Sequence, residues 1–166
     1  MNMPQINIDG LIFTFPEKWQ ASKYDEWSFY RNQLTKKWKG IKAVDVVALD
    51  PSKSAFLIEV KDYCHPETEK PSQLPEVIAN KVLHTLAAML PAKLHATNLM
   101  EKRLASEIIK CKSLHVIAHI EQPKKHRQVV DLADIKQKLR QLLHAVDAHP
   151  KVVSMNQMHT LNWTVS

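Results

Sequence analysis

Apolar residues follow two different periods along this chain, and each change of period marks the boundary between two elements. Continuous or alternating apolar runs predict β-strands, whereas apolar residues three and four positions apart predict helices. The expected elements, in chain order, are a hairpin at 6–13, a helix at 21–39, strands at 42–49 and 55–61, helices at 75–90 and 97–111, a strand at 114–120, a helix at 131–147, and strands at 152–153 and 161–165. This order predicts an α/β fold with a central mixed β-sheet flanked by helices.

Glycine and proline mark the ends of several of these elements. Asp9-Gly10 separates two short apolar stretches, which is the signature of a tight hairpin. Gly40 is expected to end the first helix and Pro91 to end the second. Both glycines of the chain are accounted for in this way, so the sequence contains no glycine-rich phosphate loop of the P-loop or Rossmann type.

Size and composition favour a single soluble domain that spans 1–166. The chain is 45% hydrophobic and 24% charged, which is ordinary for a globular protein with a buried core. Apolar runs are too short to span a membrane, and the first residues lack the pattern of a secretory signal, so we expect a cytoplasmic protein. Cys64 and Cys111 form no Cys-x-x-Cys unit and are expected to be reduced thiols.

The chain is basic, with a net charge of +6 and a pI near 9.3, which favours polyanionic partners such as DNA, RNA or an anionic membrane surface. Lysines at 36, 37, 39 and 42 surround Trp38, and this cluster is a candidate phosphate-binding edge with an aromatic side chain. A solvated helix end, whose dipole favours cations, is the alternative interpretation. The Lys-Lys-His-Arg stretch at 124–127 is a second basic candidate.

The two strands in the middle of the chain carry charged residues in a suggestive arrangement. Asp45 lies among apolar residues of the first strand, and Glu59 and Lys61 lie near the end of the second. Because side chains alternate along a strand, Glu59 and Lys61 share a face, and a hairpin would bring Asp45 opposite them. Two carboxylates and an ammonium group suit a divalent metal ion and a phosphodiester. An ion-pair face on a one-sided sheet is the alternative.

The segment 42–63, KAVDVVALDPSKSAFLIEVKDY, resembles the core of the PD-(D/E)XK nuclease superfamily. That pattern places an aspartate on one strand and Glu-x-Lys on the next, with a helix before the pair and a helix and a strand after it. The stretch 20–120 matches this order, although Val44 stands where the name-giving proline would be. The resemblance implies a restriction-endonuclease-like core and a metal-dependent nuclease that hydrolyses phosphodiester bonds of DNA.

The resemblance also implies a role for each residue of the motif. Asp45, Glu59 and the carbonyl group of Val60 would bind Mg²⁺ or Mn²⁺. Such an ion polarises the scissile phosphate and supplies hydroxide for attack. Lys61 would hold the attacking water or stabilise the charge of the transition state.

Residues from the neighbouring helices are further candidates by the same resemblance. Glu26, with Asp25 behind it, would complete the site from the helix that precedes Asp45. Lys81 would contribute from the helix that follows Glu-x-Lys, although Lys81 and His84 also fit a solvated helix face.

Two other hypotheses belong to different functional classes. The chain could be a catalytically inactive nuclease-fold module that binds nucleic acid or takes part in protein assembly. It could also be a protein–protein module whose basic charge is incidental. A homodimer is a further expectation, because small nucleases of the resembled kind often dimerise so that two sites reach both strands.

Overall fold

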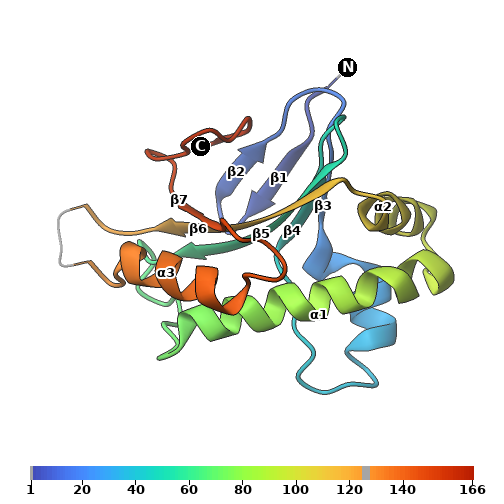
Figure 1. Cartoon of the computed structure of the whole chain (residues 1–166), viewed down its shortest axis with the longest axis horizontal. Coiled ribbons are helices and arrows are strands. Elements are labelled where there is room, and N and C mark those ends of the chain that lie inside the picture. The colour runs from blue at the N-terminus through green and yellow to red at the C-terminus, as the bar shows by residue number, and fades with distance from the viewer. Residues whose placement is uncertain (1, 125–127) are drawn as a thin grey trace.

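The computed structural model describes residues 2–124 and 128–166 and is built around a five-stranded sheet (Figure 1). Its strand order is β3-β4-β5-β6-β7, where β3 pairs antiparallel with β4, β4 antiparallel with β5, β5 parallel with β6 and β6 parallel with β7. The bounds are β3 Gln20–Lys23, β4 Val46–Leu49, β5 Ser54–Asp62, β6 Ser113–Glu121 and β7 Lys151–Val153. The predicted α/β fold with a mixed sheet is therefore confirmed.

Three helices cover one face of this sheet, and a smaller sheet covers the other (Figure 1). The helices are α1 (Leu74–His95), α2 (Leu99–Ile109) and α3 (Leu132–Leu142). The smaller sheet has the order β1-β2-β8, with β1 at Gln5–Ile8, β2 at Leu11–Thr14 and β8 at Thr164–Val165. Because both faces of the central sheet are covered, its strands are apolar at nearly every position, which is why their sequences form continuous apolar runs.

The predicted N-terminal hairpin is present. Ile8 pairs with Leu11 across the two-residue turn Asp9-Gly10. Both turn residues have positive φ, 51° for Asp9 and 97° for Gly10, as the favoured hairpin turns require.

The prediction of one continuous helix over 21–39 is wrong in its bounds. The segment contains instead β3, a 3₁₀ turn η1 (Tyr24–Glu26) and a short π-helix η2 (Phe29–Leu34). Tertiary contacts override the local pattern, since the Tyr24 N–H donates to the Asp45 carbonyl group at 2.9 Å and extends the sheet pairing. The carboxylate of Glu101 on α2 then accepts the N–H groups of Ser28 (2.7 Å) and Phe29 (3.0 Å), which fixes where the helical turn begins.

The prediction that Pro91 ends the second helix is also wrong, because α1 continues to His95. Proline cannot donate to the carbonyl group four residues earlier, which normally breaks a helix. Here that carbonyl group belongs to Ala87, which is exposed, so water can replace the lost hydrogen bond. The buried Ala88 and Ala92 on either side hold the last turns against the core.

Among the described residues, no helix has the length and apolar character needed to cross a membrane.

Candidate functional site

Asp45 lies at the entrance to β4 and is tied to the neighbouring strand. Its Oδ2 accepts the N–H of Val60 at 2.7 Å. The register of the β4–β5 pair, in which Val46 lies opposite Ile58, places Asp45 beside Glu59. The sequence prediction that Asp45 and Glu59 face one another across a hairpin is thus met in the structure.

Glu59 lies at the centre of a charged cluster and is only 2% exposed, whereas the other members of the cluster are half-buried. One carboxylate oxygen, Oε1, accepts the Lys81 Nζ at 2.6 Å and lies 3.7 Å from the Lys61 Nζ. Its other oxygen, Oε2, has no hydrogen-bond partner among the described residues. We call Asp45, Glu59, Lys61 and Lys81 the buried ionic cluster.

Burial and crowded charge shift the pKa values of this cluster. Burial, assisted by the negative charge of Asp45, raises the pKa of Glu59 to about 8 despite the opposing effect of Lys81. Burial also raises the pKa of Asp45, although Lys81 and the Val60 N–H oppose the shift. Burial lowers the pKa of Lys81, but the charges of Glu59 and Asp45 outweigh it, so that pKa lies above its usual value.

The structure does not bring Glu26 into the cluster. Its exposed carboxylate pairs instead with Lys23 at 3.0 Å and Arg31 at 3.7 Å. Asp25, which the sequence analysis placed behind Glu26, is the nearer acid: burial and then the charge of Asp45 raise its pKa. Residues 24–26 fold as a single 3₁₀ turn rather than as part of a longer helix. In this turn Asp25 is half-buried and Glu26 is exposed.

Lys81 is the member of the cluster that sequence reasoning placed least well. The sequence leaves Lys81 open between a site residue and part of a solvated helix face, and the structure shows it paired with Glu59. A signal was present in the sequence: Lys81 follows the buried Ile78 by three positions and precedes the buried Thr85 by four. A lysine on the buried stripe of a helix that packs on a sheet needs a carboxylate beneath it.

A metal ion at Asp45 and Glu59 stays a prediction. The described residues contain no group of three or more His, Cys, Asp or Glu side chains that could hold a metal ion. Mg²⁺ can bind through one or two carboxylates and retained waters, and the free Oε2 of Glu59 is compatible with that. The ammonium group of Lys81, however, already neutralises Oε1.

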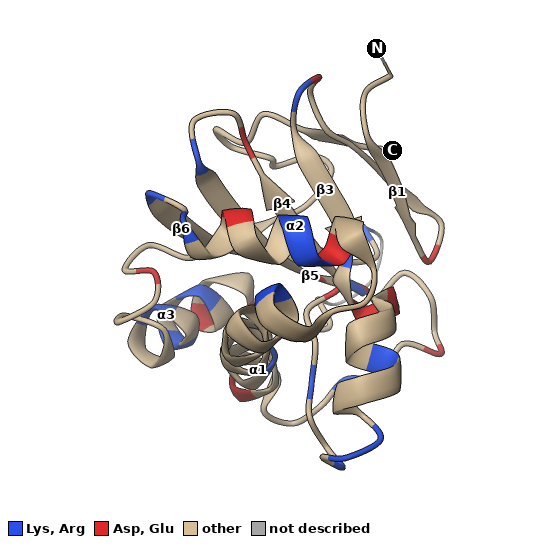
Figure 2. Cartoon of the chain, turned by 90° about the vertical axis from the view of Figure 1, so that its right-hand side faces the viewer, with Lys and Arg blue, Asp and Glu red and all other residues tan. Residues whose placement is uncertain are grey.

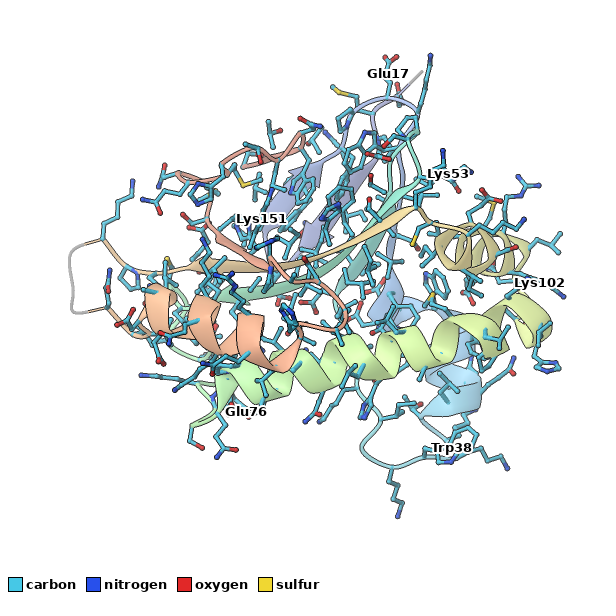
Figure 3. The ribbon with its side chains drawn as sticks, viewed as in Figure 1. Glu17, Trp38, Lys53, Glu76, Lys102 and Lys151 are labelled. Carbon is cyan, nitrogen blue, oxygen red and sulfur yellow. The ribbon has the colours of Figure 1, made fainter. Side chains whose placement is uncertain are left out.

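A second candidate site is the loop that joins η2 to β4. Its lysines at 36, 37, 39 and 42 are exposed, and Trp38 is 61% exposed. Figure 2 shows Lys and Arg along this loop at the lower right, and Figure 3 places Trp38 on the loop below α1. We call residues 35–42 the basic loop. The other basic candidate, 124–127, lies largely outside the described residues, because 125–127 are not described.

The basic loop borders a cavity of about 500 Å³. The cavity is lined by side chains from η2, the loop and the end of α1, including Phe29, Leu34, Trp38, Pro91 and His95. Its volume falls within the range of roughly 300–1,000 Å³ that is typical of small-ligand sites. The exposed aromatic ring, the cavity and the cations therefore lie together on one surface.

The chain is 32% identical over 151 residues to a cysteine–tRNA ligase of Neisseria meningitidis serogroup A / serotype 4A (strain DSM 15465 / Z2491). The match covers 73% of this chain and 22% of that protein, so the chain spans only about a fifth of its relative's length. No protein-family model matches the chain. No solved structure matches it either.

The comparison overturns the predicted DNA nuclease. The similar protein is named as a tRNA ligase, and nothing in the comparisons associates the chain with hydrolysis of DNA. The motif Asp45, Glu59 and Lys61 converges in space as the resemblance implied, but such a short motif was an insufficient guide to activity. The expected homodimer stays a prediction.

Proposed function

We propose that this chain is an RNA-binding module and that its ligand is tRNA. The proposal rests on a segment in which every charged residue is positive. Between Glu26 and Asp45 the sequence has no acidic residue and five basic ones: Arg31, Lys36, Lys37, Lys39 and Lys42. Exposed cations attract a phosphate backbone and release its counterions. The tRNA ligase relative supports RNA as the polyanion.

The four lysines of this stretch are exposed and lie close together in the sequence, whereas several other lysines of the chain form ion pairs. Lys23, Lys53, Lys61 and Lys81 are each paired with a carboxylate. In the described part of the chain, by contrast, the basic loop makes no salt bridge. An unpaired surface cation needs no internal ion pair to be broken before it meets a phosphate group.

Binding, rather than ligation, is the activity proposed. A match over 22% of the relative's length gives no basis for carrying over a complete ligase reaction. The chain also lacks a glycine-rich phosphate loop, since Gly10 lies in a hairpin turn and Gly40 in the basic loop. The chain resembles only one segment of a larger protein that is named as a tRNA ligase. A role in holding the RNA fits such a segment.

We further propose that the core is of the restriction-endonuclease-like type, with the buried ionic cluster serving the fold. The order of β4, β5, α1 and β6 and the positions of Asp45, Glu59 and Lys61 support this relationship. In this proposal the cluster joins α1 to the β4–β5 hairpin through the Lys81–Glu59 pair.

Removing charge from the basic loop tests the proposed function. The triple variant Lys36→Ala/Lys37→Ala/Lys39→Ala should weaken binding to a tRNA transcript and reduce the slope of log K against log salt by about 2 to 3, at roughly 0.7–0.9 per lost phosphate contact. Fluorescence anisotropy over a salt series measures both quantities. The matched control Lys18→Ala/Lys70→Ala/Lys136→Ala removes three exposed lysines elsewhere and should change the slope little. Equal slopes for the two triple variants would refute the basic loop as the RNA contact.

A further inference from the structure

We propose that Trp38 stacks on an unpaired nucleobase of the RNA while the lysines beside it contact the flanking phosphates. This inference rests on the proposed function and specifies the form of RNA that the basic loop takes. A single-stranded or looped-out nucleotide offers a free base face, which an intact duplex does not. Stacking on an aromatic side chain beside a positively charged groove is a general way to bind such nucleotides.

The exposure of Trp38 sets it apart from the other tryptophans. Trp19, Trp27 and Trp163 are 8%, 3% and 2% exposed, whereas Trp38 is 61% exposed. The three buried rings pack in the core, and two of them, Trp19 and Trp163, lie within an aromatic cluster. Trp38 serves no such packing role, so its large apolar surface remains available for a ligand.

The surroundings of Trp38 combine an apolar wall with polar and cationic groups, which suits a nucleotide. Lys36 and Lys37 line the same cavity of about 500 Å³ as the indole ring, and Asn32 and Gln33 add amide groups to its wall. A base could enter beside the ring, with amides available for its edge and ammonium groups for its phosphates. The aromatic ring thus matches the face of a base, the amides match its polar edge, and the cations match the phosphate group.

The charge of the loop argues against a second copy of the chain as the occupant. Exposed apolar residues on α1, Leu83, Leu90 and Leu94, would otherwise make self-association a candidate. A twofold contact, however, brings the same patch of both copies together. It would therefore place two sets of the loop lysines against each other without compensating acids.

The basic loop is held at both ends by the helical layer. Before the loop, Glu101 of α2 accepts the N–H groups of Ser28 and Phe29. After it, the Lys42 N–H donates to His84 Nδ1 at 2.9 Å and the Val44 N–H donates to Thr85 Oγ1 at 3.1 Å, both on α1. Such fixed ends reduce the conformational entropy that would be lost when an RNA strand orders the loop.

The experiment uses the intact chain and a single-stranded RNA oligonucleotide of about ten nucleotides, a length within the site sizes known for single-strand binding. Trp38→Ala should weaken binding by about 5- to 150-fold, the equivalent of one lost base–aromatic stack. Trp38→Phe keeps an aromatic face and should retain most of the affinity. Leu99→Ala, which removes another highly exposed apolar side chain, is the matched control and should bind like the wild type.

Intrinsic fluorescence adds a direct readout, because only Trp38 among the four tryptophans is exposed. Single-stranded RNA should quench the wild-type emission, and the Trp38→Phe variant should lose that quenching while still binding. A blunt RNA duplex of the same length should bind without quenching.

The outcomes separate this inference from the proposed function. If the wild type binds neither tRNA nor oligonucleotide at low salt, the proposed function itself fails. If the wild type binds both but Trp38→Ala binds as tightly, RNA binding stands and the stacking inference is overturned. Quenching that depends on protein concentration without RNA would mean that Trp38 contacts another protein chain, which also overturns it.

Discussion

The free energy of unfolding is expected to fall by up to about 5 kcal/mol as pH rises from 4.5 to 8, because Glu59 titrates at a higher pH in the folded chain than in the unfolded one. In the unfolded chain this carboxyl group loses its proton near its ordinary pKa of 4.5, whereas folding raises that pKa to about 8. Between these values the folded state holds a proton that the unfolded state has released. Stability is therefore greatest below pH 4.5 for this group and is lost as pH rises through 8.

Urea unfolding at constant ionic strength between pH 5 and pH 9 measures this effect. Glu59→Gln keeps the shape of the side chain and removes its titration, so its stability should change much less across the range. Glu67→Gln, at an exposed loop position, is the matched control and should follow the wild type. If the stability of Glu59→Gln falls with pH as steeply as that of the wild type, Glu59 is not the group responsible. If wild-type stability rises from pH 5 to pH 8, the predicted pH dependence itself is wrong.

Glu101→Ala is expected to lower the free energy of unfolding by about 3 kcal/mol. The substitution removes two charge-assisted hydrogen bonds and leaves the buried N–H of Phe29 without an acceptor. Glu101 is only 8% exposed and joins α2 to the start of η2, so the loss falls on the contact between two segments far apart in sequence. Chemical denaturation at pH 7 measures the change.

Two comparisons make the Glu101 prediction specific. Glu101→Gln keeps an acceptor oxygen and should lose less stability than Glu101→Ala. Glu107→Ala removes another carboxylate of α2, one that forms surface ion pairs with Lys53 and Lys110, and should change stability little. Similar losses for Glu101→Ala and Glu107→Ala would show that the buried hydrogen bonds to Ser28 and Phe29 are not the cause.

The strands were predictable because burial of both sheet faces leaves a strong pattern in the sequence. β5 and β6 extend over Ser54–Asp62 and Ser113–Glu121, close to the runs expected at 55–61 and 114–120. The segment 21–39 was not predictable from its period, since its apolar stripe is real but its backbone is set by Asp45 and Glu101. The end of α1 was wrongly predicted at Pro91 for a related reason. The tendency of proline to end a helix was outweighed by the packing of α1 on the core.

The charged cluster was predictable in part. Asp45 and Glu59 could be paired from strand alternation and the hairpin alone, because both rules are local. Choosing between Asp25 and Glu26 required the turn geometry of η1, which no local period encodes. The step from residues to activity failed because an acidic pair with a lysine serves a structural ion pair as well as a metal site, and Lys81 was needed to tell the two apart.

The attachment of the basic loop at both ends makes it a replaceable unit. Its fixed points and the core-packed Ile41 lie outside the exposed stretch 36–39, so a substitute sequence of equal length could be inserted there without disturbing the core. The fold would then act as a frame that carries interchangeable recognition segments, and variation confined to this stretch would alter ligand preference at little cost to folding.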